Sequence, residues 1–179
     1  MGYPKQLLMH EGEPLVRRAA IAAAGAGAAP VIVVLGADAD QVSPALTDLP
    51  SVTTVFNRDW QTGLASSLAA GLRALTETSS CDGVLVLLAD QPLVDVPSLE
   101  RLVRAFDAEH RIIASEYDQT MGVPVVFGRE HIADLMALRG DSGAGRWLRD
   151  RAGAVTRVPL QDAAVDIDTP QDVDRLDSA

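Results

Sequence analysis

An aspartate that directly follows an apolar strand pattern is the first candidate for chemistry. Asp90 ends the apolar run 85–89 and is followed by Gln91 and Pro92. Open α/β sheets bind ligands at the carboxyl ends of their strands. A carboxylate placed there can hold Mg²⁺, whose other ligands are water and substrate phosphates. The alternative is a turn-forming aspartate before a proline, which requires no metal.

A second group of carboxylates lies near the carboxyl terminus. The one-residue gap between Asp166 and Asp168 places both side chains on the same face of an extended segment. Asp168 and Asp90 together would form the two-carboxylate set of a metal–triphosphate site. The alternative is helix capping, because Asp168 precedes a predicted helix start and Thr169 with Asp172 resembles a capping box.

The basic residues include a single lysine. Of the 15 lysine and arginine residues only Lys5 is a lysine, and it follows Pro4 in a predicted loop. An ammonium group on a loop can neutralise the charge of a phosphate under attack. The alternative is an ordinary exposed lysine.

Three segments rich in small residues complete the candidates. Gly63 and Ser67 share one side of a helix opening, where free N–H groups and small side chains would let a nucleotide approach; the alternative is close packing of helix on sheet. The loops around 122–124 and 140–145 could shape a pocket for an acceptor.

The elements that must position these residues alternate along the chain. Short apolar runs rich in Val and Ile alternate with longer Ala- and Leu-rich patterns, which is typical of βαβ units and a mostly parallel sheet. The strands that we predict cover residues 6–9, 31–35, 52–56, 83–88, 112–115, 123–127 and 155–159. The helices that we predict cover residues 14–24, 38–46, 63–77, 97–109, 129–138, 143–151 and 170–176.

Composition excludes several classes of protein. At 179 residues the chain fits one α/β domain spanning 1–179. A net charge of −10 disfavours nucleic acid and anionic membrane as partners. The single Cys81 excludes a disulfide framework. The apolar runs are too short to span a membrane and the start lacks a signal-peptide pattern, so we expect a cytoplasmic protein.

Taken in order, the motifs resemble the molybdenum cofactor cytidylyltransferase family of the MobA-like nucleotidyltransferase superfamily. The resemblance covers nearly the whole chain and implies a Rossmann-like three-layer α/β/α fold. It rests on residues 1–8, 57–71, 88–92, 122–124, 140–144 and 166–170.

The resemblance also implies roles for the candidate residues. Lys5 would contact the triphosphate, and Asp90 and Asp168 would bind Mg²⁺. Gly63 and Ser67 would lie against the nucleotide. The acceptor side would be lined by Gly122, Pro124, Asp141 and Gly143.

The implied reaction is Mg²⁺-dependent transfer of a cytidylyl group from CTP to a phosphorylated acceptor such as molybdopterin, with release of pyrophosphate. A molybdoenzyme that receives the cofactor would be a further partner. The family's first motif runs Leu-x-Ala-Gly-x-Ser-x-Arg-Met-Gly-x-x-Lys, whereas this sequence opens at Met1-Gly2, so we expect its first strand and Gly-rich loop to be missing. Guanylyl or another nucleotidyl transfer, and a non-catalytic nucleotide-binding module, stay open as alternatives.

Overall fold

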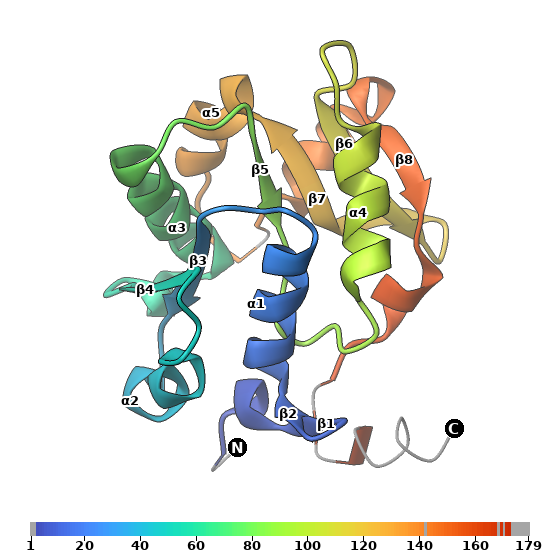
Figure 1. Ribbon diagram of the computed structural model, residues 1–179. Helices are drawn as coiled ribbons and strands as arrows, with labels where there is room; N and C mark the ends of the chain where they lie inside the picture. Colours follow the sequence, from blue (N-terminus) through green and yellow to red (C-terminus); the bar gives the residue numbers. More distant parts are fainter. Residues whose placement is uncertain (1–2, 142, 168, 170, 173–179) are drawn as a thin grey trace.

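The strands of the protein form two main groups (Figure 1). The computed structural model describes residues 3–141, 143–167, 169 and 171–172. In one group, β3 (Val31–Leu35) pairs in parallel with β4 (Val52–Phe56). In the other, four strands have the order β5–β7–β6–β8. A short antiparallel pair, β1 (Met9–His10) and β2 (Glu13–Pro14), precedes both groups.

The four-stranded sheet is mixed. Its strands are β5 (Gly83–Val86), β6 (Ile112–Tyr117), β7 (Thr120–Gly128) and β8 (Thr156–Pro159). β7 runs antiparallel to β5 and to β6, and β6 runs parallel to β8. β5, β6 and β8 therefore point in the same direction, and the tight β6–β7 hairpin supplies the reversed strand.

Helices cover both faces of this sheet. On one face Phe127 of β7 packs with residues of α3 (Leu64–Thr78), α5 (Ile132–Met136) and α6 (Gly145–Asp150). On the other face the adjacent Val126 packs with residues of α1 (Leu15–Gly25) and α4 (Val96–Ala105), which crosses in front of the sheet in Figure 1. Adjacent residues of one strand thus enter different cores. The three-layer α/β/α prediction is confirmed.

Helix α1 joins the two groups of strands. Its Ala22 packs in the core beneath α4, whereas the adjacent Ala23 packs with Val31 and Leu35 of β3. Alanine is suited to this position because a helix that is buried on two sides needs small side chains to approach both neighbours closely. The Ala-rich composition of the segment therefore has a packing cause.

The strand predictions hold from residue 31 onward and fail near the start of the sequence. β3 and β4 match the predicted residues, and β5 to β8 each lie within a few residues of the prediction. The predicted strand 6–9 is wrong: residues Lys5–Leu7 form a 3₁₀ turn, η1, and only Met9–His10 is extended. The Leu7 N–H donates to the Pro4 carbonyl at 3.0 Å, so the proline starts a turn that interrupts the strand.

The helix predictions are correct in place but too long in three cases. Segment 38–46 divides at Pro44 into α2 (Ala39–Val42) and the 3₁₀ turn η2 (Ser43–Leu46). Segment 97–109 ends early as α4, because the Asp107 carboxylate accepts the N–H groups of Glu109 and His110. Segment 129–138 opens with η4 (Arg129–His131) before α5. Three further 3₁₀ turns are η3 (Trp60–Thr62), η5 (Ala152–Ala154) and η6 (Gln161–Ala164).

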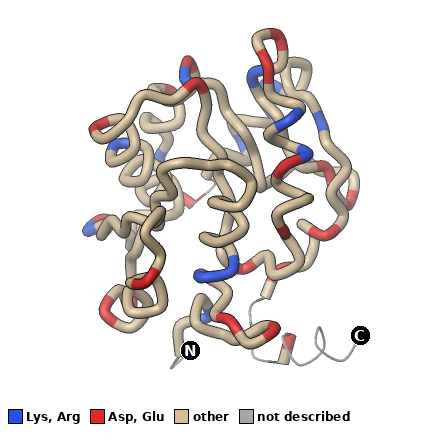
Figure 2. Tube along the Cα trace, viewed as in Figure 1, with Lys and Arg blue, Asp and Glu red and all other residues tan. Residues whose placement is uncertain are grey.

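The last predicted helix, 170–176, lies outside the described residues except for Gln171 and Asp172. The Asp172 carboxylate accepts the Thr169 N–H at 2.8 Å, as a capping box requires. No helix within the described ranges is long and apolar enough to cross a membrane. Acidic and basic residues are distributed over many segments of the trace in Figure 2.

Candidate functional site

Lys5 and Asp90, two predicted site residues, form an ion pair. The Lys5 Nζ lies 2.7 Å from Asp90 Oδ2, and 31% and 20% of the two side chains are exposed. Lys5 belongs to the turn η1, whereas Asp90 follows β5. The fold therefore brings together an ammonium group and a carboxylate that are 85 residues apart in the sequence.

The second carboxylate oxygen of Asp90, unlike the first, is unpaired within the described residues. Oδ1 is buried and accepts no hydrogen bond from the part of the chain that the structure describes. A buried carboxylate oxygen without a partner is costly, and a divalent cation would satisfy it, since Mg²⁺ takes one or two carboxylates as ligands. No group of three or more His, Cys, Asp or Glu side chains is placed to hold a metal within the described ranges. Asp90 Oδ1 thus offers a single carboxylate oxygen to a cation.

The segment that carries the second carboxylates runs beside Asp90. The Ile167 N–H donates to the Asp90 carbonyl at 2.8 Å, which places Asp166 next in the chain to this contact. Asp168 lies outside the described residues. Its predicted meeting with Asp90 thus stays a prediction, but its neighbour Ile167 is hydrogen-bonded to that residue.

Ser67 belongs to a hydrogen-bonded network centred on Asn57. The Asn57 Nδ2 donates to Ser66 Oγ at 2.8 Å and to Ser67 Oγ at 3.0 Å, and Asn57 Oδ1 accepts the Asp59 N–H at 2.9 Å. Asn57 is only 4% exposed. The network fixes the chain between β4 and the first turn of α3, which is where Gly63 lies.

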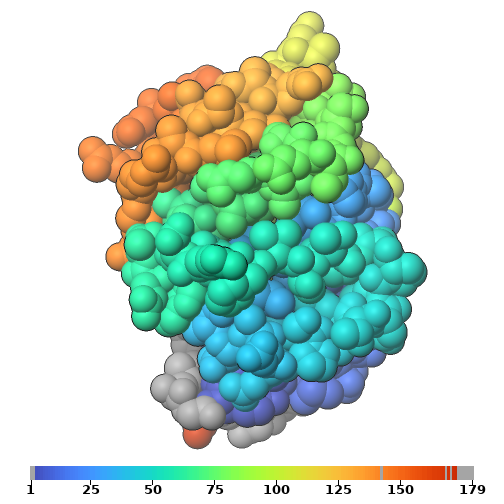
Figure 3. Space-filling view, turned by 90° about the vertical axis from the view of Figure 1, so that its left-hand side faces the viewer, coloured from blue at the N-terminus to red at the C-terminus, as the bar shows by residue number. Residues whose placement is uncertain are grey.

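Gly63 faces the loop 140–143. A Cβ on Gly63 would lie 2.3 Å from Asp141 Oδ1 and 2.6 Å from the Gly140 carbonyl, and its φ of 107° also favours glycine. Gly143 in turn contacts the Leu64 side chain. Figure 3 shows this face, on which the segment after β4 lies near the segment around residue 140. The predicted nucleotide and acceptor segments are therefore adjacent.

Two N–H groups that were expected to be free at this helix start have partners. The Ala65 N–H donates to the Gly140 carbonyl at 3.1 Å, and the Ser66 N–H donates to the Gly63 carbonyl at 3.1 Å. The expectation of an open helix N-terminus is corrected to that extent. Small residues also allow close packing of helix α3 on the sheet, as the alternative interpretation expected: a Cβ on Gly71 would lie 3.0 Å from the Val34 side chain of β3.

One predicted acceptor residue of β7, Gly122, lies against Tyr117. A Cβ on Gly122 would lie 2.1 Å from the Tyr117 hydroxyl. Burial raises the pKa of Tyr117 and the nearby Asp166 carboxylate raises it further, which keeps the phenol protonated at neutral pH. The Pro124 carbonyl accepts a hydrogen bond from the buried Ser115 hydroxyl at 2.7 Å. Gly122 therefore provides space for a phenol, and Pro124 is fastened to the neighbouring strand.

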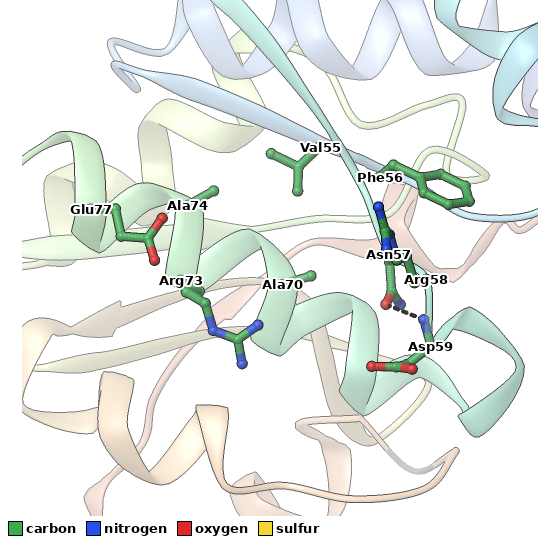
Figure 4. Close-up of a pocket in the computed structure, with 9 residues that line it drawn as sticks. All are labelled: Val55, Phe56, Asn57, Arg58, Asp59, Ala70, Arg73, Ala74 and Glu77. Atoms are coloured by element: carbon green, nitrogen blue, oxygen red, sulfur yellow. Dashed lines mark hydrogen bonds between the residues drawn. The ribbon is translucent and has the colours of Figure 1, made fainter.

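A shallow pocket of about 290 Å³ lies beside β4 and α3 (Figure 4). Asn57 and Asp59 line it, so it adjoins the hydrogen-bonded network. None of the predicted site residues that the structure describes lines this pocket. Its lining is Val55, Phe56, Asn57, Arg58, Asp59, Ala70, Arg73, Ala74 and Glu77.

A family model described as a MobA-like NTP transferase domain matches residues 1–156. The chain belongs to this family. Among curated proteins, this MobA-like transferase is 32% identical over 184 residues to nicotine blue oxidoreductase of Paenarthrobacter nicotinovorans, a match that covers 97% of the chain and 87% of that protein. The purine catabolism protein PucB of Bacillus subtilis is 32% identical over 122 residues, which are 66% of the chain and 58% of PucB.

Solved structures share the fold of the MobA-like transferase. Rv0371c of Mycobacterium tuberculosis H37Rv superposes with a TM-score of 0.82 and 27% identity, covering 100% of the chain and 92% of Rv0371c. A structure of Rv0371c in complex with manganese gives a TM-score of 0.76 and 26% identity, covering 99% and 94% of the two chains.

Sequence reasoning did not assign three side chains that organise this site. Asn57, Gln91 and Tyr117 are polar residues that are buried or half-buried next to predicted site residues. The available signal was a polar side chain at the end of an apolar strand pattern: Asn57 directly follows β4, and Gln91 follows Asp90 after the apolar run 85–89. Such a residue has to find partners once it is buried.

Proposed function

We propose that this MobA-like transferase catalyses Mg²⁺-dependent transfer of a cytidylyl group from CTP to a phosphorylated acceptor, with molybdopterin as the candidate acceptor. The observation that carries the proposal is the placement of Asp90 at the carboxyl end of β5, with one oxygen paired to Lys5 and the other buried without a partner. Family membership supports nucleotidyl transfer. The choice of CTP and of molybdopterin comes from the motif resemblance.

In this reaction an oxygen of the acceptor phosphate attacks the α-phosphorus of the nucleotide. The bond from that phosphorus to the bridging oxygen breaks, and pyrophosphate leaves with the bonding electrons. A bound divalent cation would neutralise charge on the phosphate oxygens. A protein nucleophile is not needed, because the acceptor supplies the attacking oxygen.

The residues of the chain would bind and orient the two substrates. Asp90 and Asp168 would hold the cation, and Lys5 would offset the charge that develops on the phosphates. Groups that stabilise developing charge in this way are worth about 3–4 kcal/mol. Gly63 and Ser67 would lie against the nucleotide. The acceptor would meet Gly122, Pro124, Asp141 and Gly143.

Related structures support a divalent cation. The complex of Rv0371c with manganese comes from a protein that is 26% identical to this chain. Mn²⁺ and Mg²⁺ both prefer oxygen ligands, so we propose Mg²⁺ as the physiological cation and Mn²⁺ as a substitute that is easier to detect.

The test is a transfer assay with purified protein, Mg²⁺, molybdopterin and CTP or GTP labelled at the α-phosphate. We expect label to move to the acceptor with stoichiometric release of pyrophosphate, at a higher kcat/KM for CTP. A preference for GTP would overturn the cytidylyl assignment and retain nucleotidyl transfer.

Two further outcomes would overturn nucleotidyl transfer itself. Tight CTP binding without pyrophosphate release would indicate a nucleotide-binding module. Because one relative is named as an oxidoreductase, the assay includes NADH and NADPH with a quinonoid dye, and substrate-dependent oxidation of either cofactor in place of transfer would indicate redox chemistry.

A further inference from the structure

Gln91 occupies a buried position between three segments of the site. Its side chain is 5% exposed. The Nε2 group donates to the Ala163 carbonyl at 2.7 Å and to the Val123 carbonyl at 3.1 Å. Ala163 belongs to η6 and Val123 to β7. One side-chain amide therefore links the Asp90 loop to both of its neighbours.

The link to Ala163 is one of two hydrogen bonds that attach the following segment to the Asp90 loop. The chain leaves Ala163, passes Asp166 and reaches Ile167, whose N–H donates to the Asp90 carbonyl at 2.8 Å. The segment 163–167 is thus fastened at both ends to two consecutive residues, Gln91 and Asp90. Asp166 lies within this fastened segment, and Asp168 follows the segment in the sequence.

We infer that Gln91 is a positioning residue, which holds the carboxylate-bearing segment against Asp90 so that two carboxylates can share one divalent cation. The inference rests on the proposed metal site. A glutamine suits the task because its amide carries two N–H donors, and here they meet two backbone carbonyls on different elements. Residues that orient metal ligands commonly change metal affinity 10- to 100-fold when they are lost.

One polar atom of the Gln91 side chain is unpaired, which allows a substitution that tests the positioning role at a limited cost in stability. Gln91 Oε1 is buried and accepts no hydrogen bond from the described residues. Gln91→Met keeps a similar volume and removes both this unpaired acceptor and the donors. Removing the unpaired acceptor stabilises the fold, and this gain offsets part of the stability that is lost with the two donated hydrogen bonds. The variant should therefore fold, while the segment 163–167 loses one of its two attachments.

Ser115→Ala is the matched control. Ser115 is fully buried, and its hydroxyl donates to the Pro124 carbonyl at 2.7 Å. It therefore contributes a buried side-chain bond to a carbonyl on β7, as Gln91 does, but its hydroxyl donates to β7 and not to the segment 163–167. A general loosening of β7 would affect both variants in the same way.

The experiment measures Mn²⁺ binding to the full-length protein, without nucleotide, by the electron paramagnetic resonance signal of free Mn²⁺, together with thermal unfolding. We expect Gln91→Met to raise the Mn²⁺ dissociation constant at least about tenfold and Ser115→Ala to change it less than about twofold. In steady-state assays Gln91→Met should raise the metal concentration for half-maximal rate more than the KM for nucleotide at saturating metal.

The outcomes distinguish this inference from the proposed function. If the wild-type protein binds no Mn²⁺, the proposed metal site fails. If the wild type binds and Gln91→Met binds equally well, or if both variants weaken binding alike, the positioning role of Gln91 alone fails. Gln91→Asn, which keeps the donors on a shorter side chain, replaces the methionine variant if that variant does not fold. Failure of both to fold would make Gln91 a determinant of folding and overturn the inference.

Discussion

The candidate site has two halves that are built in different ways. The charged half consists of Lys5, Asp90 and Asp166, and its Lys5–Asp90 contact joins residues that are 85 positions apart. The hydrogen-bonded half consists of Asn57, Gly63, Ser66 and Ser67, and its Asn57–Ser67 contact spans 10 positions. The first depends on the whole fold, and the second on one local segment.

We expect the two halves to contribute differently to turnover and to stability. The Lys5–Asp90 pair is partly exposed, and such pairs contribute about 0–1 kcal/mol to folding. The Asn57 amide is buried and fully used in three hydrogen bonds, and leaving such groups unpaired costs about 1–3 kcal/mol each. Substitutions in the charged half should reduce turnover, and those in the hydrogen-bonded half should reduce stability.

The largest effect is expected for Asp90→Asn. The amide keeps the shape of the side chain but removes the charge that would bind the cation, so kcat/KM for nucleotidyl transfer should fall by about 10³ or more. Pyrophosphate release measures this loss, and thermal unfolding should show a small change. Full transfer activity in the presence of Mg²⁺ would remove Asp90 from the catalytic set.

Lys5→Met should have the next largest effect. Loss of the only ammonium at this site should lower kcat by about 10², and Lys5→Arg should recover part of it, since a guanidinium retains the charge with another geometry. The same assay measures both variants. An equal loss in Lys5→Arg and Lys5→Met would mean that geometry matters and charge alone does not.

Asn57→Ala should reduce stability more than turnover. The substitution removes the side-chain acceptor of the Asp59 N–H and the amide donor to the two serine hydroxyls, so the free energy of unfolding in urea should fall by about 1–3 kcal/mol. The exposed Gln41, which bonds Asp38, gives the control Gln41→Ala, with an expected change within about 0.5 kcal/mol. A loss of turnover without a loss of stability would show that Asn57 belongs functionally with the charged half.

The smallest effect concerns an ion pair away from the site. Both Glu130 oxygens accept from Arg111 at 2.9 Å, and these bonds lower the pKa of Glu130 from 4.5 to about 2. The carboxylate is favoured in the folded state, so its contribution to stability is complete above the unfolded pKa and is lost as pH falls from 4.5 toward about 2.

Arg111→Gln should therefore lower the melting temperature slightly at pH 7, and its difference from the wild type should shrink as pH falls below about 4.5. Nucleotidyl transfer should be unchanged. A difference in melting temperature that grows toward low pH would contradict the direction of this pKa shift.

The sequence predicts best what depends on neighbours in the chain. The bounds of β3 and β4 were predicted to the residue: β3 is an uninterrupted run of Val, Ile and Leu, and β4 is a more exposed run of Val, Thr and Phe, all residue types that favour strands. It failed at residues 6–9, where a turn begun by Pro4 outweighs the strand preference of the following residues. The end of α4 was missed because the Asp107 side chain competes for backbone N–H groups.

For the site, the sequence by itself determined which groups are available: one lysine on a loop, a carboxylate after β5 and a pair of carboxylates near the end. Tertiary structure alone decided that Lys5 pairs with Asp90, that Gly63 meets Asp141, and that Gln91 fastens the segment 163–167. The physical reason is distance along the chain. Local patterns set backbone conformation, whereas a contact between remote side chains exists only after strands and helices have packed into one core.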